Sequence, residues 1–393
     1  MDQQVANRIK SSICNGNRIS GYSHDFYKYP ARFPPSFARQ IIEVFTEKND
    51  LVIDPYMGGG TTLVEANVLG RRAVGIDISS LATFISRVKT YLFSEKELGE
   101  ISQWLYAIQP KLNIHLKVDR PSIWIKEGYQ RNINGRYIWR VRKTIELMLN
   151  EISNLSNPKY QDFCRCLLLR TAQWAIDCRS EIPSVSKFRN RSLQFLSEFS
   201  IGALQFAEAV KNNEKHFLEN ESRRIQCVNS SSDKINNLIH EPPKLILTSP
   251  PYPGVHVLYH RWQVHGRKET PSPFWIAGCK DGHGESFYTM GGRTDYGISK
   301  YFTDIERSFR TIYNLSDKNT FIVQVIAFSE PDKQFDRYLN IMKRIGFLEE
   351  RFPKLSNSED GRLWRSVPNR KWYTAKKDLL TSSNEVVLFH RKH

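Results

Sequence analysis

Residues 51–62 read LVIDPYMGGGTT, and this stretch decides the fold. Three apolar residues predict a short strand, and three consecutive glycines then lead into a helix that we expect over residues 61–69. Gly70 closes that helix, and residues 73–76 (AVGI) predict a second strand that ends at Asp77. A strand, a glycine turn, a helix and a second strand form the opening unit of a parallel α/β sheet.

The glycine turn lies where α/β sheets bind nucleotide-like ligands, and glycines allow close approach because no Cβ intervenes. The spacing is not G-x-G-x-x-G and no lysine follows, which disfavours a phosphate-binding loop. Asp54 suits a positive amino group, and Asp77 suits both hydroxyls of a ribose. These features fit S-adenosyl-methionine, which carries an amino group, a sulfonium and a ribose. The alternative is a tight structural turn with an ordinary aspartate at the strand end.

Apolar periodicity divides the chain into three parts. Residues 1–95 contain the unit above, preceded by a proline-rich segment from which a helix begins near Ser36. Residues 96–224 show helical spacing with basic residues on the polar faces, which predicts a mostly helical insertion. Residues 225–393 return to α/β, with strands expected at 225–228, 244–248, 321–328, 347–352 and 385–390, a helix at 334–344 and a long functional loop at 253–300. We therefore expect an α/β, Rossmann-like sheet with a helical insertion.

The tetrapeptide Ser249-Pro250-Pro251-Tyr252 ends the strand at 244–248. Two prolines cannot continue a central strand, so they form a rigid elbow at its carboxyl end. We expect the Ser249 hydroxyl and the Pro250 carbonyl to accept both hydrogens of a base amine and to stabilise positive charge on its nitrogen. The Tyr252 ring would stack on a base extruded from the duplex. None of the six cysteines follows a proline, which disfavours a cytosine C5 reaction through a thiol.

Here the sequence resembles a known family. Residues 54–62 and 249–252 resemble the cofactor loop and catalytic tetrapeptide of the amino-methylating DNA methyltransferases, and residues 27–33 (YKYPARF) resemble their N-terminal element that closes over the cofactor. The resemblance implies a class I methyltransferase sheet, S-adenosyl-methionine as cofactor, and methylation of cytosine N4 or adenine N6. Serine at the first tetrapeptide position is more typical of the cytosine enzymes, whereas adenine enzymes more often have Asp or Asn.

The resemblance assigns roles to residues of the first and third parts. It makes residues 1–95 a cofactor-binding part and residues 225–393 a catalytic part, with Ser249, Pro250, Pro251 and Tyr252 as catalytic residues. The cofactor-binding residues that it implies are Tyr29, Pro30, Phe33, Asp54, Pro55, Tyr56, Gly58, Gly60, Thr61, Thr62, Asp77 and Ile78. The strand at 225–228 is followed by NSSSD, where the family often has an acidic residue for the adenine. Either Asp233 or a serine is open for that role.

The net charge of +16, from 57 Lys and Arg against 41 Asp and Glu, favours a polyanionic partner, with nucleic acid as the default. A merely solubilising surface is the alternative. Residues 256–268 (HVLYHRWQVHGRK) mix aromatic and basic side chains, so His260, Arg261, Arg267 and Lys268 are DNA-contact candidates; a helix that closes the site is the other interpretation. The histidines there lack thiolate partners at a standard spacing, so we expect no metal.

Two further segments are ambiguous. Residues 361–373 either form a loop at the DNA surface or pack Trp364 and Trp372 into the core. The helical insertion, residues 96–224, is the candidate for target recognition, although a charged helix is more often a solvated face.

No apolar stretch approaches the roughly 20 residues of a membrane span, and the N-terminus has no apolar core typical of a secretory signal. We therefore expect a cytoplasmic protein with reduced thiols. The leading hypothesis is a cytosine-N4 DNA methyltransferase that acts on double-stranded DNA beside a cognate restriction nuclease or in defence. The alternatives are adenine-N6 methylation, methylation of an RNA base amine, an inactive DNA-binding module and a nicotinamide-dependent oxidoreductase. The sequence specifies neither the recognition site nor the oligomeric state.

Overall fold

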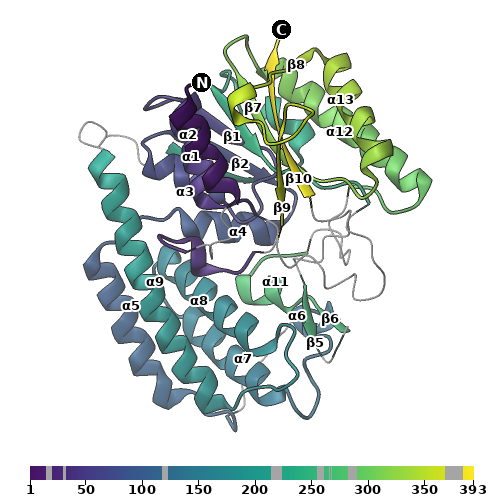
Figure 1. The fold of residues 1–393 in the computed structure, drawn as a ribbon. Coiled ribbons are helices and arrows are strands. Elements are labelled where there is room, and N and C mark those ends of the chain that lie inside the picture. Colours follow the sequence, from purple (N-terminus) through teal and green to yellow (C-terminus); the bar gives the residue numbers. More distant parts are fainter. Residues whose placement is uncertain are drawn as a thin grey trace.

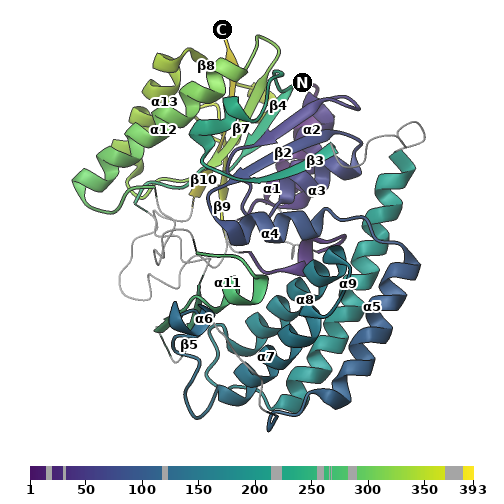
Figure 2. The same ribbon diagram turned by 180° about the vertical axis from the view of Figure 1, so that it is seen from behind.

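The computed structural model describes residues 1–14, 20–29, 32–116, 123–213, 224–254, 261–264, 266, 268–281, 290–367 and 384–393. A twisted sheet with helices on both faces occupies one end of the molecule, and a bundle of long helices occupies the other (Figure 1). Both chain ends lie at the sheet end, away from the bundle (Figure 2).

The main sheet has the strand order β3-β2-β1-β4-β7-β10-β8. These strands are β3 (Ile225–Asn229), β2 (Arg72–Asp77), β1 (Leu51–Asp54), β4 (Leu245–Thr248), β7 (Phe321–Ile326), β10 (Asn384–Lys392) and β8 (Phe347–Glu349). The first five are mutually parallel, whereas β10 is antiparallel to β7, to β8 and to β9 (Leu363–Ser366). The carboxyl ends of β1, β2, β3 and β4 therefore share one edge, where open α/β sheets bind ligands. The predicted Rossmann-like α/β sheet with a helical insertion is confirmed.

Both faces of the sheet are covered, which explains why its strands are apolar without alternation. Val52 and Leu245 point to one face, where they pack with α1 (Gln3–Cys14), α2 (Pro35–Phe45) and α3 (Thr61–Val68). Ile53 and Ile246 point to the other face, where α12 (Asp295–Leu315) and α13 (Pro331–Ile345) cover them. The short 3₁₀ helix η3 (Ser232–Asn237) lies beside α12 on that face.

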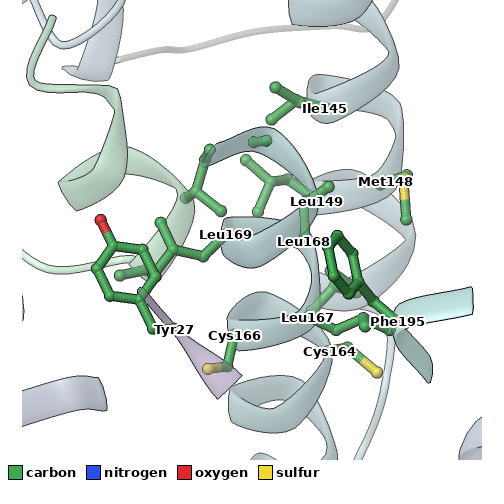
Figure 3. Close-up of a cluster of buried hydrophobic side chains, with 14 of the residues drawn as sticks. Tyr27, Ile145, Met148, Leu149, Cys164, Cys166, Leu167, Leu168, Leu169 and Phe195 are labelled. Atoms are coloured by element: carbon green, nitrogen blue, oxygen red, sulfur yellow. The ribbon is translucent and has the colours of Figure 1, made fainter. Parts of the chain in front are cut away.

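The helical body consists of α5 (Glu95–Ile108), α6 (Ile123–Lys126), α7 (Trp139–Ser153), α8 (Pro158–Ile176) and α9 (Val185–Asn213), with η2 (Gln109–Lys111). Its core surrounds α8, whose Leu168 and Leu169 are fully buried (Figure 3). Helix α4 (Ser80–Lys89) follows β2 and packs into the same core, so it joins the sheet to the body. The segment with η1 (His24–Phe26) also belongs to this core, where Phe26 stacks on Phe199 with ring centroids 4.2 Å apart.

Residues 253–300 do not form the single long loop that we expected. They include β5 (Trp262–Val264), paired with β6 (Lys268–Thr270), then α11 (Ser272–Ala277) and the first turn of α12. Trp262 and Phe274 pack into the core of the helical body rather than against the sheet. The helical body therefore draws on residues from beyond 96–224. Two predicted strands are shorter than expected: β7 ends at Ile326 and β8 at Glu349, before η4 (Pro353–Leu355).

Within the described residues, no helix combines the length and the apolar character that a membrane span requires.

Candidate active site

Asp54 connects the glycine loop to the tetrapeptide. Thr62 Oγ1, at the start of α3, donates to Asp54 Oδ2 at 2.7 Å, and Thr248 Oγ1 donates to Asp54 Oδ1 at 2.7 Å. Thr248 directly precedes Ser249, and β1 and β4 are adjacent parallel strands. The glycine loop ends at residue 62 and the tetrapeptide begins at residue 249. The two motifs therefore lie side by side at one edge of the sheet, although they are far apart in sequence.

The Asp54 carboxylate is only 2% exposed, and the backbone N–H of Tyr56 also donates to Oδ1 at 3.2 Å. Burial raises the pKa of Asp54 to about 6, although the bonds from Thr62 and Thr248 oppose that shift. The sequence suggested Asp54 as a ligand for an amino group. The structure gives it a clear first role, which is to hold the two motifs together; contact with a ligand stays a prediction.

Side chains of α4 hydrogen-bond to the carbonyls of the glycine loop, and the Tyr29 side chain lies against its glycines. Ser86 Oγ donates to the Gly58 carbonyl at 3.0 Å, and Nζ of the buried Lys89 donates to the Gly59 carbonyl at 2.9 Å. The Tyr29 side chain lies against the loop, so that a Cβ added at Gly59 would come within 2.9 Å of Tyr29 Cβ. Only glycine fits at that position, because backbone and ring approach so closely.

Other residues of the N-terminal element lie elsewhere. Phe33 packs with Met57 and Phe37 in the core beneath the sheet, away from solvent. Pro30 lies outside the described residues. Pro55 and Thr61, which flank the glycine loop, are buried as well. Of the described residues of this element, Tyr29 lies against Gly58 and Gly59 of the glycine loop.

Asp77 lies beside the same loop, at the carboxyl end of β2. Its Oδ2 accepts the Gly58 N–H at 3.0 Å and its Oδ1 accepts the Ser79 N–H at 2.9 Å. The side chain is half-buried, and this burial raises the pKa of Asp77 to about 6. The next residue, Ile78, is 53% exposed, which is unusual for a large apolar side chain. A carboxylate beside an exposed apolar surface matches the ribose and base of a nucleoside.

Asp233 and Ser232, two candidates for the adenine contact, differ in their hydrogen bonds. Ser232 Oγ already donates to Ser308 Oγ at 3.0 Å. Asp233 pairs through Oδ2 with Arg307 Nε at 3.1 Å, whereas its Oδ1 is buried and has no hydrogen-bond partner among the described residues. An unpaired buried acceptor favours a ligand donor, such as an exocyclic amine. Asp233 therefore fits that role better than Ser232.

The tetrapeptide is held by two side chains that the sequence did not indicate. Tyr252 Oη donates to Glu385 Oε1 at 2.7 Å and lies 3.2 Å from Ser249 Oγ. Tyr301 Oη, from α12, donates to the Pro251 carbonyl at 2.9 Å. No described residue donates to the Pro250 carbonyl, so this predicted acceptor has no partner within that part of the chain.

Of the four residues expected to contact DNA, the structure describes Arg261 and Lys268. Arg261 is 8% exposed, and its guanidinium donates to the buried Asp281 at 2.6 Å. It therefore stabilises the interior and is poorly placed for a phosphate, contrary to our expectation. Lys268 is exposed at the start of β6. His260 and Arg267 lie outside the described residues, as do the other histidines of residues 256–265.

Of the ambiguous segment at residues 361–373, the structure describes residues 361–367. The Trp364 ring packs on Phe335 with centroids 5.7 Å apart, and its Nε1 donates to Asp360. Trp364 thus packs against α13 rather than standing free at the surface. Trp372 lies outside the described residues.

Comparisons with known proteins find similarity to DNA methyltransferases. Residues 7–84 match the N6/N4 methyltransferase family model, described as DNA methylase. The chain is 24% identical over 255 residues to the type II methyltransferase M.BsoBI of Geobacillus stearothermophilus, a match that covers 58% of this chain and 49% of that protein. It is 28% identical over 148 residues to M.MvaI of Kocuria varians, covering 32% of this chain and 33% of that protein. The chain thus spans half or less of the length of these curated relatives.

Among solved structures, an rRNA methylase from Streptococcus thermophilus aligns over 93% of this chain and 99% of that chain, with 6% identity and a TM-score of 0.33. So low a score carries no argument about function. The family model matches residues 7–84, which include the glycine loop and Asp77. By sequence, the chain is similar to the amino-methylating DNA methyltransferases of the N6/N4 type.

Proposed function

We propose that the protein is a DNA methyltransferase that methylates the N4 amine of cytosine in double-stranded DNA. The observation that carries this proposal is the pair of hydrogen bonds from Thr62 and Thr248 to Asp54. Through them the glycine loop and the Ser-Pro-Pro-Tyr elbow share one edge of the sheet. A methyl donor on the loop and a base amine on the elbow would then be neighbours.

The family relationship implies S-adenosyl-methionine as cofactor, and the residues fit it. Asp77 offers a half-buried carboxylate for the ribose hydroxyls, Ile78 an apolar surface for the adenine and Asp233 an unpaired acceptor for its amine. Tyr29 covers the loop on which the methionine end would lie. When bound, this cofactor supplies an activated methyl group on a positively charged sulfur.

The Ser-Pro-Pro-Tyr elbow would bind and orient the target amine. A base amine is a weak nucleophile, because its lone pair is delocalised into the ring. Ser249 Oγ and the Pro250 carbonyl would accept its two hydrogens, which localises the lone pair on nitrogen and stabilises the charge that develops there. The Tyr252 ring, half-exposed beside them, would stack on the flipped base. No covalent intermediate is needed.

Three observations support the choice of substrate. Serine at position 249 favours cytosine over adenine, since it is the residue more typical of the cytosine enzymes. The net charge of +16 favours a polyanion. The relatives M.BsoBI and M.MvaI are type II methyltransferases, which supports a role in restriction–modification beside a cognate nuclease. We assign target recognition to the helical body, residues 96–224 with the packed segment 262–277.

Expression in an unmethylated host, followed by modification-sensitive sequencing of its DNA, tests this function. We expect N4-methylcytosine at one short sequence, and none from a Ser249→Ala variant expressed at the same level. N6-methyladenine in its place would retain the amine chemistry and reject cytosine as the base. DNA without any methylated amine would reject the proposed function.

A further inference from the structure

The Tyr252 hydroxyl lies between Ser249 and a buried glutamate. Glu385, at the start of β10, is 2% exposed, and its Oε1 accepts the Tyr252 hydroxyl hydrogen at 2.7 Å. The Tyr252 oxygen lies 3.2 Å from Ser249 Oγ, so the three side chains form one chain of hydrogen bonds. This chain joins the first and last residues of the tetrapeptide to a strand 133 residues further along.

Arg365 on β9 compensates the charge of Glu385. The two residues are directly opposite in the antiparallel pair β9–β10, strands that lie side by side in Figure 1. Arg365 Nε donates to Glu385 Oε2 at 2.7 Å, while Oε1 faces Tyr252. A buried carboxylate is tolerated when it is paired and hydrogen-bonded in this way.

The direction of the hydrogens follows from the chemistry of the carboxylate. An ionised carboxylate can only accept, so Tyr252 must donate its single hydrogen to Glu385. The Tyr252 oxygen can then only accept from Ser249, which must donate its own hydrogen to Tyr252. Because the Ser249 hydrogen is used toward Tyr252, Ser249 Oγ can only accept a hydrogen from any further partner.

We propose that Glu385 is a positioning residue for amine methylation, which acts through Tyr252 to fix the Ser249 hydroxyl as an acceptor for the target amine. This inference rests on the proposed function. Without Glu385, the Ser249 hydrogen is free to point toward the amine, where two donors would face each other. Glu385 thus selects the hydroxyl orientation that the transfer step requires, without touching the base.

A Glu385→Gln variant reverses the chain of hydrogen bonds while keeping its shape. Arg365 can only donate, so it holds the amide oxygen of the new side chain, and the amide nitrogen then faces Tyr252. Tyr252 must accept from that nitrogen and turn its own hydrogen toward Ser249. We therefore expect kcat to fall about tenfold, with KM for DNA and affinity for S-adenosyl-homocysteine unchanged within about twofold.

A double-mutant cycle with Tyr252→Phe separates positioning from general destabilisation. Phenylalanine keeps the ring and removes the hydroxyl through which Glu385 acts, so Glu385→Gln should have no further effect in that background. The matched control is Glu349→Gln, which breaks the Arg362–Glu349 pair of the same sheet, with Nε to Oε1 at 2.6 Å, away from the tetrapeptide. This control should keep the wild-type kcat. Thermal unfolding of each variant checks that all of them fold.

The outcomes are distinct. A wild-type kcat in Glu385→Gln, or effects of Glu385→Gln and Tyr252→Phe that multiply in the double variant, would overturn the positioning role while the wild type still methylates DNA. An equal loss in Glu349→Gln would also overturn it. If the wild type methylates no DNA amine, the proposed function fails and this role fails with it.

Discussion

Replacing Thr248 by valine tests whether Asp54 holds the two motifs together. The substitution keeps the shape of the side chain and removes the hydroxyl that donates to Asp54 Oδ1 at 2.7 Å in a fully buried position. A hydrogen bond to a charged group contributes about 1.5–3 kcal/mol, so we expect the free energy of unfolding to fall by that amount at pH 8. Urea titration measures the change directly.

The pH dependence makes this prediction specific. The Thr248 hydroxyl stabilises the ionised form of Asp54, whose pKa in the folded protein is about 6. Above pH 6 the carboxylate is ionised and the full bond is lost in Thr248→Val. At pH 5 Asp54 is largely protonated in both proteins, so the difference in unfolding free energy should shrink.

A matched control and a functional readout complete the test. Thr171→Val, in α8, replaces a fully buried threonine whose hydroxyl donates to the Leu167 carbonyl at 2.8 Å. Its effect should be smaller and independent of pH, because no titrating partner is involved. We also expect Thr248→Val to lower kcat, since the elbow loses its link to the glycine loop. A loss that is the same at pH 5 and pH 8, or equal to that of Thr171→Val, would refute the reasoning.

Three other perturbations probe the rest of the site. Gly59→Ala should weaken S-adenosyl-homocysteine binding by calorimetry at least tenfold, because its Cβ would come within 2.9 Å of Tyr29 Cβ; unchanged affinity would mean that the loop does not contact the ligand. Because Asp77 ionises with a pKa of about 6, and an ionised carboxylate accepts ribose hydroxyls best, the same affinity should rise about tenfold from pH 5 to pH 7.5. A flat profile, or an equal rise in Asp77→Asn, would exclude Asp77 from the ligand site. Tyr252→Ala should slow methylation and reduce the fluorescence gain of 2-aminopurine placed at the target base; full activity would exclude stacking.

The sequence predicted the parts of the site that are built from local patterns. The glycine loop, Asp77 and the tetrapeptide each lie at the carboxyl end of a strand, and the strand order brings these ends to one edge of the sheet. Helix α4 was not predicted, although eight of its ten residues are buried and its N-cap Ser79 accepts from the Ala82 N–H.

The partners of these motifs were not predictable, because they come from distant strands and helices. Glu385 precedes an apolar strand like many solvent-exposed glutamates, and only the pairing of β10 with β7 and β9 brings it to Tyr252. Arg261 looked like a surface cation in a basic segment, yet Asp281, 20 residues later, pairs with it in the interior. Ion pairs of this kind depend on tertiary packing, which leaves no periodic signal in the sequence.

A crystal structure of the protein with bound S-adenosyl-homocysteine would test the central claim most directly. The account predicts that the ribose hydroxyls bind Asp77 and that the sulfur faces Ser249 and Tyr252, across the edge that Asp54 holds together. A ligand bound elsewhere, or one whose sulfur points away from the tetrapeptide, would contradict it.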